Sequence, residues 1–155
     1  MGTYNDASML PETLDSVLCQ DFPDFEIIVV NDGSTDPRVE EILQEYTRLH
    51  SRVRLVAKPN EGLTRALIDG CAISRGEYIA RIDAGDVMLP GRLAAQARVL
   101  DEHPECAFVS CWTEFCGPQW EALWLTKGAP RSTEPVSMLP NDPRQGLLGD
   151  VPHHG

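Results

Sequence analysis

The stretch Phe25-Glu26-Ile27-Ile28-Val29-Val30-Asn31-Asp32-Gly33-Ser34 decides the fold of this chain. β-Branched residues fill positions 27–30, and such a short apolar run is typical of a strand that is buried on both faces. Asn, Asp and Gly follow directly, and these residues favour turns. We therefore predict a buried strand over 24–30 that runs into an acidic turn at 31–34.

Helical and strand-like patterns alternate on both sides of this strand. Helices are predicted over 10–20, from 37, over 63–74 and from 90, and further strands over 53–56, 78–82 and 107–110. Asp36 or Thr35 is expected to cap the second helix, with Pro37 in its first position. Strands that alternate with helices form a mostly parallel sheet covered on both faces. Ligands of such α/β sheets bind at the carboxyl ends of the strands, where the acidic turns lie.

Both ends of the pattern are abrupt. An α/β chain normally places a strand before its first helix, and we expect Met1 to Asn5 to be too short to form one. After about Gly117 the periodicity weakens into a segment rich in proline and glycine. The sequence therefore predicts an α/β sheet that is incomplete at both ends, with one portion over 1–116 and a loop-rich portion over 117–155.

Composition restricts the partners. The 155 residues include 24 acidic and 13 basic side chains, for a net charge of -11, which argues against binding of nucleic acid or of an anionic membrane by bulk electrostatics. The five cysteines form an odd set without a C-x-x-C pair, and this suits a reducing compartment, so we expect a cytoplasmic protein. No apolar run approaches the roughly 18 residues that a membrane span needs.

Several motifs occur together in a fixed order. They are Tyr4-Asn5, the stretches 10–18 and 25–36, Asn60-Glu61-Gly62-Leu63, the stretch 75–80, and Asp83-Ala84-Gly85-Asp86 followed by 89–93. This set resembles the nucleotide-sugar-binding half of a family 2 glycosyltransferase with the GT-A, Rossmann-like fold. The resemblance covers about Thr3 to Ser110 closely and makes 117–155 the start of the acceptor side.

The resemblance implies the activity and the partners. Such an enzyme transfers a sugar from a nucleoside-diphosphate donor, usually a UDP-sugar, to an acceptor hydroxyl with inversion. The acceptor is a glycan or a lipid-linked sugar in cell-surface polysaccharide or glycan synthesis, and the whole protein associates peripherally with the membrane. The alternatives are a non-catalytic nucleotide-binding or interaction module and an unrelated α/β domain, although no G-x-G-x-x-G motif follows a strand here.

The same resemblance assigns donor-binding residues. Asp32 would accept a hydrogen bond from the base, and Thr3 and Tyr4 would line the base pocket. Arg65 or Lys58 would contact the diphosphate. Alternatively, the stretch 31–34 is only a polar turn that closes a strand, and Arg65 is a solvated arginine on a helix face.

The acidic turn departs from the family pattern. The family usually has D-x-D-D where this chain has Asp83-Ala84-Gly85-Asp86, so Gly85 replaces the carboxylate that commonly touches the metal. Asp83 and Asp86 remain as ligands for Mg²⁺ or Mn²⁺, with Asp83 also near the ribose, and oxygen ligands suit these ions. Alternatively, Asp86 caps the helix near Pro90 and Asp83 satisfies turn amides.

Other polar and aromatic residues give weaker signals. Cys106, Cys111 and Cys116 are expected to be buried reduced thiols, because their spacing fits no zinc site. The aromatic residues Trp112, Trp120 and Trp124 line an acceptor groove or pack in a core, and His153-His154 are possible ligands near the diphosphate. No carboxylate is a good candidate for the general base that an inverting transferase requires, so the catalytic residue stays unassigned.

Overall fold

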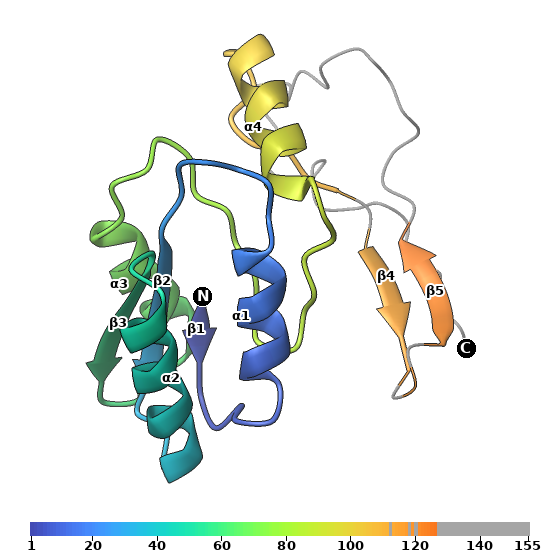
Figure 1. Ribbon diagram of the computed structural model, residues 1–155. Helices are drawn as coiled ribbons and strands as arrows, with labels where there is room; N and C mark the ends of the chain where they lie inside the picture. The colour runs from blue at the N-terminus through green and yellow to red at the C-terminus, as the bar shows by residue number, and fades with distance from the viewer. Residues whose placement is uncertain (112, 118, 120, 127–155) are drawn as a thin grey trace. The chain divides into compact units, whose positions relative to one another are not determined.

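The computed structural model describes residues 1–111, 113–117, 119 and 121–126 (Figure 1). Its elements, in chain order, are β1 (Gly2–Thr3), α1 (Leu10–Leu18), β2 (Ile27–Asp32), α2 (Pro37–Leu49), β3 (Val53–Lys58), α3 (Leu63–Ala72), α4 (Arg92–Glu102), β4 (Thr113–Cys116) and β5 (Ala122–Thr126). The chain divides into two compact units after Ala95. The predicted boundary between 116 and 117 concerns donor and acceptor roles, and it stays a prediction.

The first unit contains a parallel sheet in the order β1-β2-β3. Gly2 pairs with Val30, and Thr3 pairs with Asn31. The register of β2 and β3 runs from Ile27↔Val53 to Asp32↔Lys58. The expectation that Met1 to Asn5 are too short for a strand is therefore wrong: two residues pair with β2, and Val30 also donates its N–H to the Met1 carbonyl at 2.9 Å.

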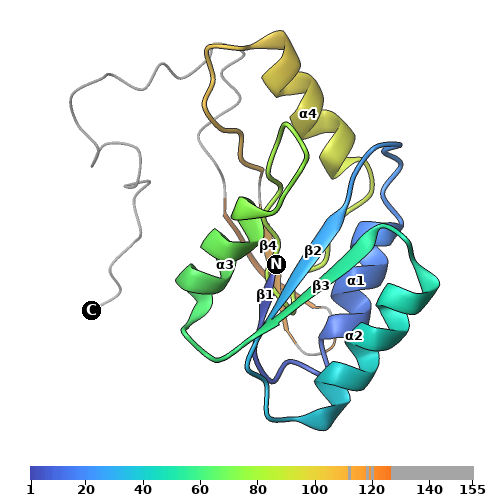
Figure 2. The same ribbon diagram turned by 90° about the vertical axis from the view of Figure 1, so that its left-hand side faces the viewer.

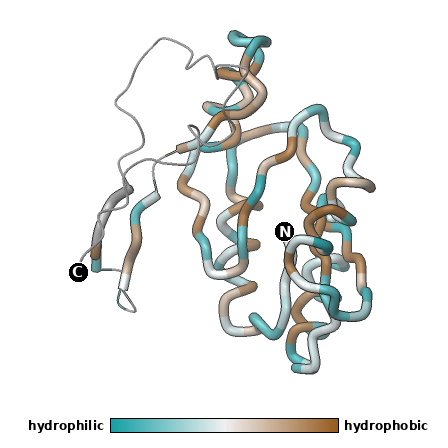
Figure 3. The backbone as a smooth tube through the Cα atoms, turned by 180° about the vertical axis from the view of Figure 1, so that it is seen from behind, coloured by the Kyte–Doolittle hydropathy of each residue, from teal (hydrophilic) through white to brown (hydrophobic). Residues whose placement is uncertain are grey.

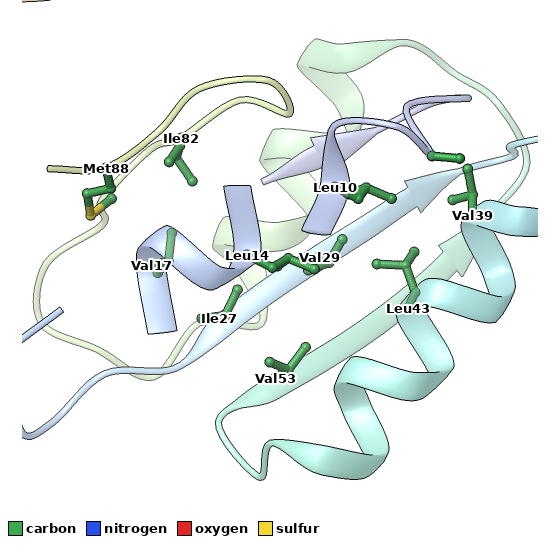
Figure 4. Packing of buried hydrophobic residues seen from close by; sticks show 11 residues of the cluster. Leu10, Leu14, Val17, Ile27, Val29, Val39, Leu43, Val53, Ile82 and Met88 are labelled. Atoms are coloured by element: carbon green, nitrogen blue, oxygen red, sulfur yellow. The ribbon is translucent and has the colours of Figure 1, made fainter. Parts of the chain in front are cut away.

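Helices cover both faces of this sheet, with α1 and α2 on one face and α3 on the other (Figure 2). Ile27 and Val29 of β2 pack with Leu14 of α1 and Leu43 of α2 in one buried cluster (Figure 4). Burial of each such side chain stabilises the fold by about 1.5–3 kcal/mol. Val30 points the other way, and a methyl group added at Gly70 of α3 would lie 3.3 Å from its Cγ2 atom. The predicted α/β arrangement is therefore present.

The second helix begins as its sequence predicts. The Asp36 side chain accepts a hydrogen bond from the backbone N–H of Arg38 at 3.0 Å, and Pro37 occupies the first turn. Of the two candidate caps, the structure therefore selects Asp36 rather than Thr35. Hydrophilic and hydrophobic residues are interspersed along the backbone of this unit (Figure 3). This is expected for helices that have one buried face and one exposed face.

Two predicted strands are replaced by other structure. The segment 78–82 forms no strand, although Ile82 is buried in the core. Residues 78–81 are exposed, so this segment lacks the burial that an inner strand of a covered sheet would have. The segment 107–110 is not a strand either, and Phe108 within it is exposed. Strand structure in this part of the chain is instead the antiparallel pair β4–β5.

Candidate functional site

Polar residues gather where the three parallel strands end. Thr3, Asp32 and Lys58 are the last residues of β1, β2 and β3. Thr3 and Asp32 are each 3% exposed, whereas Tyr4, the residue after β1, is 47% exposed. The predicted residues of the base pocket therefore lie at one sheet edge, with Tyr4 as the solvent-facing member.

Asp32 holds the loop that leads into α3. Its Oδ1 atom accepts a hydrogen bond from Glu61 N at 3.0 Å, and its Oδ2 atom accepts one from Gly62 N at 2.7 Å. Gly62 is the N-cap of α3, so the carboxylate also faces the positive end of the helix dipole. Each carboxylate oxygen keeps a further lone pair for a ligand.

The turn after β2 is closed by Asn31 rather than by Asp32. The Asn31 Oδ1 atom accepts a hydrogen bond from Ser34 N at 3.0 Å. Gly33 allows the turn to approach the loop before α3, since its φ is +73° and an added Cβ would lie 2.6 Å from Asn60 N. The polar-turn interpretation therefore applies to Asn31, while the Asp32 carboxylate is directed at the neighbouring loop.

An ion-pair chain connects Asp32 to Arg65. Lys58 Nζ lies 3.9 Å from Asp32 Oδ1, 2.6 Å from Glu61 Oε2 and 2.8 Å from Asp69 Oδ2. Hydrogen bonds to Asp69 and Glu61 raise the pKa of Lys58. Arg65 Nε lies 3.1 Å from Asp69 Oδ1, and the Arg65 side chain is 59% exposed. Three carboxylates therefore surround Lys58, and Arg65 is the more accessible of the two cations.

The acidic turn is built around a glycine. Arg81 forms two hydrogen bonds to the Asp83 carboxylate, at 3.1 and 2.7 Å, and Asp86 N donates to the Asp83 carbonyl at 3.1 Å. Asp86 is exposed. Gly85 has a φ of +97°, and an added Cβ would lie 2.8 Å from Met9 Sδ. The turn therefore has a conformation that disfavours the aspartate typical of this position.

The acidic turn interacts with the start of β1 through charge and with α1 through a backbone hydrogen bond. Burial lowers the pKa of the Met1 amino group, and the charge of Asp83 opposes this shift. The backbone of the same turn is bonded to α1, because Gly85 N donates to Thr13 Oγ1 at 3.0 Å. The predicted base pocket and the acidic turn therefore both belong to the first compact unit.

The sequence did not indicate the roles of two residues near the predicted base pocket, Asn5 and Asp6. Asn5 has a φ of +62°, and its Oδ1 atom accepts hydrogen bonds from the backbone N–H groups of Thr35 and Asp36 at 2.9 and 3.0 Å. The Asp6 carboxylate accepts a hydrogen bond from Thr3 Oγ1 at 3.1 Å. The tolerance of asparagine for positive φ was the one available signal for Asn5, and none marked Asp6.

The expectations for the cysteine, tryptophan and histidine residues have separate outcomes. All five cysteines are free thiols, but Cys111 and Cys116 are exposed and Cys106 is only partly buried, so the expectation of buried thiols is wrong. The segment that carries these cysteines is short of apolar cover, since β4 is exposed along its length. Trp112, Trp120 and His153-His154 lie outside the described residues, as does the side chain of Trp124.

In the described part of the chain, no group of three or more His, Cys, Asp or Glu side chains is arranged to hold a metal ion. The candidate ligands are the two carboxylates of the acidic turn, Asp83 and Asp86. None of the helices among the described residues combines the length and apolar character needed to cross a membrane.

Comparison with known proteins identifies the family. The sequence model of glycosyl transferase family 2 matches residues 1–149. The chain belongs to this family. It is 32% identical over 117 residues to an uncharacterized glycosyltransferase of Methanocaldococcus jannaschii, covering 74% of this chain and 40% of the relative. It is 37% identical over 87 residues to the chondroitin synthase of Pasteurella multocida, covering 56% of this chain and 9% of that protein.

A solved structure supports the same assignment. The family 2 chain resembles S. aureus TarS, residues 1–349, with a TM-score of 0.60 and 29% sequence identity. The superposition covers 66% of this chain and 31% of TarS. The predicted GT-A fold is thereby confirmed. The family 2 chain spans at most two fifths of the length of each relative named here.

Proposed function

We propose that this chain binds the nucleoside-diphosphate sugar, a UDP-sugar, of an inverting family 2 glycosyltransferase. The sugar passes to an acceptor hydroxyl of a glycan or a lipid-linked intermediate in cell-surface polysaccharide or glycan synthesis. The observation that carries the proposal is the buried Asp32 carboxylate at the carboxyl end of β2, beside Thr3 and the exposed Tyr4. Ligands of open α/β sheets bind at the carboxyl ends of the strands, which is where these residues lie.

The proposed base site uses Asp32 as an acceptor and Tyr4 as a wall. A uracil N–H is a donor, and the free lone pairs of the Asp32 carboxylate can accept it while the Glu61 and Gly62 amides hold the side chain in place. The half-exposed Tyr4 ring supplies an aromatic face for the base. Thr3 is buried and its hydroxyl donates to Asp6, so it supports the floor of this site.

The diphosphate is proposed to lie between Arg65 and the acidic turn. Mg²⁺ and Mn²⁺ sites in nucleotide enzymes commonly combine one or two carboxylates with substrate phosphate oxygens. Asp83 and Asp86 match this donor set, and the exposed Asp86 is the freer ligand, because Arg81 already pairs with Asp83. A bound cation would neutralise the charge that develops on the leaving diphosphate. Arg65, exposed on α3, would add a cation on the other side.

A second candidate is a nucleotide-binding module without transferase activity. Gly85 stands where the family usually has an aspartate, and Arg81 occupies the Asp83 carboxylate. No described residue has been assigned as the general base. Both candidates predict nucleotide binding, so only a measurement of turnover separates them.

We further propose that the protein works in the cytoplasm, with the whole protein peripherally attached to a membrane. The five free cysteines support a reducing compartment. Fractionation of cells that express the full-length protein, with and without high salt, tests the attachment.

Calorimetry and a turnover assay test the proposed function. We expect UDP to bind in the presence of Mn²⁺ and to lose at least tenfold in affinity in Asp32→Asn, since one acceptor oxygen of the carboxylate becomes a donor group. Asp24 is exposed and precedes the amino end of β2, whereas Asp32 ends this strand, so Asp24→Ala provides the control. Hydrolysis or transfer of a UDP-sugar that disappears in Asp86→Ala would support the transferase over the binding module. Absence of UDP binding to the wild-type chain would contradict both.

A further inference from the structure

A row of polar side chains crosses the otherwise apolar inner side of α1. Leu10, Leu14 and Val17 of this helix are buried in the core. Thr13, Ser16 and Gln20 lie between and beyond them at spacings of three and four residues, so they share one side of the helix and of its C-terminal extension. We call Thr13, Ser16 and Gln20 the α1 polar row. All three bond to the backbone of the segment 85–93.

The bonds of the α1 polar row follow that segment in order. Gly85 N donates to Thr13 Oγ1 at 3.0 Å, and Met88 N donates to Ser16 Oγ at 3.0 Å. Gln20 Nε2 donates to the carbonyls of Met88 and Leu89 at 3.2 and 3.0 Å. Its Oε1 atom accepts from Leu93 N at 3.3 Å. The side chains of the α1 polar row therefore bond to five backbone groups of this segment, while Asp86 N and Arg92 N bond to the nearby carbonyls of Asp83 and Leu89.

Burial makes these contacts energetically significant. Thr13 is 0% exposed and Gln20 is 5% exposed, so water cannot easily replace them as partners. Removing one partner of a buried hydrogen bond leaves the other group unsatisfied, which is unfavourable. Among the described residues, no strand pairs with the segment 85–93 that could take over these bonds. The α1 polar row therefore fixes the path of this segment.

Thr13 reaches the acidic turn itself. Its partner Gly85 lies between Asp83 and Asp86, and Asp86 N bonds to the Asp83 carbonyl within the same turn. Gly85 has a positive φ of 97°, which is one of several conformations that glycine adopts freely, so contacts around the residue select it. The Thr13 hydroxyl holds the amide at the centre of this turn. The two carboxylates on either side are thereby directed relative to α1.

We propose that Thr13, supported by Ser16 and Gln20, is a positioning residue for the two carboxylates of the acidic turn. The proposal rests on the proposed function, in which Asp83 and Asp86 receive the cation and the diphosphate of the donor. Thr13 does not touch the ligand. It acts through the Gly85 amide, so its loss weakens cation-dependent nucleotide binding only as far as that binding uses the carboxylates.

A double-mutant cycle tests this with UDP and Mn²⁺ as the probe. Thr13→Val removes the hydroxyl with little change of shape, and Thr13→Ser restores it. Thr47→Val on α2 is the matched control, because Thr47 Oγ1 donates to the Leu43 carbonyl of its own helix at 2.8 Å, away from the acidic turn. We expect Thr13→Val to weaken UDP binding in Mn²⁺ about tenfold, and Thr13→Ser and Thr47→Val to change it less than twofold. In an Asp83→Ala/Asp86→Ala background, which lacks both carboxylates, Thr13→Val should change the affinity less than twofold, since coupled residues are non-additive.

The outcomes separate this inference from the proposed function. Equal effects of Thr13→Val with and without the two carboxylates would overturn the inference and leave the proposed function intact. The same holds if the Thr13→Val protein binds UDP as the wild type does. A wild-type chain that binds no UDP would overturn both. If Thr13→Val does not fold, Ser16→Ala takes its place in the cycle, because Ser16 is only partly buried. Amide exchange at Gly85 should accelerate in Thr13→Val without ligand, and unchanged exchange would also contradict the inference.

Discussion

The buried carboxylate of Asp32 accepts a 2.7 Å hydrogen bond from the backbone N–H of Gly62, the N-cap residue of α3. A second bond to Glu61 N, at 3.0 Å, completes the attachment. The residue proposed to read the base therefore also fixes the loop that begins the helix carrying Arg65. Under the proposed function, base recognition and the placement of the Arg65 cation near the diphosphate therefore depend on the same side chain.

Replacement of Asp32 should cost stability as well as nucleotide affinity. In Asp32→Ala, two backbone amides lose a charged acceptor, so we expect the free energy of unfolding to fall by about 2–3 kcal/mol. Asp32→Asn keeps one acceptor oxygen and should lose about half as much. Urea denaturation measures the change, with Asp24→Ala as the control. Equal stability of Asp32→Ala and wild type would show that the loop does not depend on this carboxylate.

Gly33 should tolerate no side chain. Its φ is +73°, and an added Cβ would meet the Asn60 backbone nitrogen at 2.6 Å. Backbone atoms cannot rotate away as a side chain can, so Gly33→Ala combines conformational strain with a clash and should destabilise by about 2–4 kcal/mol.

Gly91 supplies the matched control for this substitution. Its φ is +80°, but nothing lies within 4 Å of an added Cβ. Gly91→Ala should therefore lose only the conformational part, about 1 kcal/mol. Thermal unfolding of both variants measures the difference, and a larger loss for Gly91→Ala would show that the close approach of the two loops is not present in solution.

Acid should weaken the fold through Glu26. Hydrogen bonds from Arg54, followed by those from Arg75, lower the pKa of Glu26 from 4.5 to about 2. The folded state therefore resists protonation of this group more than the unfolded state does. The resulting stability is fully present above pH 4.5 and is lost as the pH falls towards 2.

The size of this effect is limited by solvent. Arg75 is 75% exposed, so screening reduces the stabilisation to about 1–2 kcal/mol. Urea unfolding at pH 7 and at pH 3 measures it, and Glu26→Gln should flatten the pH dependence over this interval. Identical pH profiles for Glu26→Gln and wild type would contradict the assignment.

The sequence predicts the parts of the fold that depend on local patterns. The apolar run at 27–30 indicates the central strand, and Asp36 before Pro37 indicates the start of α2. The pairing of Gly2 and Thr3 depends instead on the backbone of β2, which no side-chain pattern reveals. The Thr13–Gly85 bond spans 72 positions. Contacts of this kind leave no periodicity, so the support of the acidic turn could not be predicted.

Restoring the family aspartate at position 85 should cost less stability when Met9 is truncated. Gly85→Asp alone meets a φ of +97° and the Met9 Sδ atom at 2.8 Å from the new Cβ. We expect a loss of about 1–2 kcal/mol, of which the part due to the clash disappears in Met9→Ala/Gly85→Asp. Met9 is 48% exposed, so its own truncation should cost little.

The Met9→Ala/Gly85→Asp variant also tests whether a carboxylate at position 85 would bind the cation. Under the proposed function, a third carboxylate adds an oxygen ligand, so Mn²⁺ titrated at fixed UDP should bind several-fold more tightly than to Met9→Ala. Gly91→Asp is the control, because it adds the same charge at another glycine with positive φ. If Gly91→Asp tightens Mn²⁺ binding as much, the gain reflects net charge alone. If neither variant changes it, Gly85 does not occupy a metal-binding position.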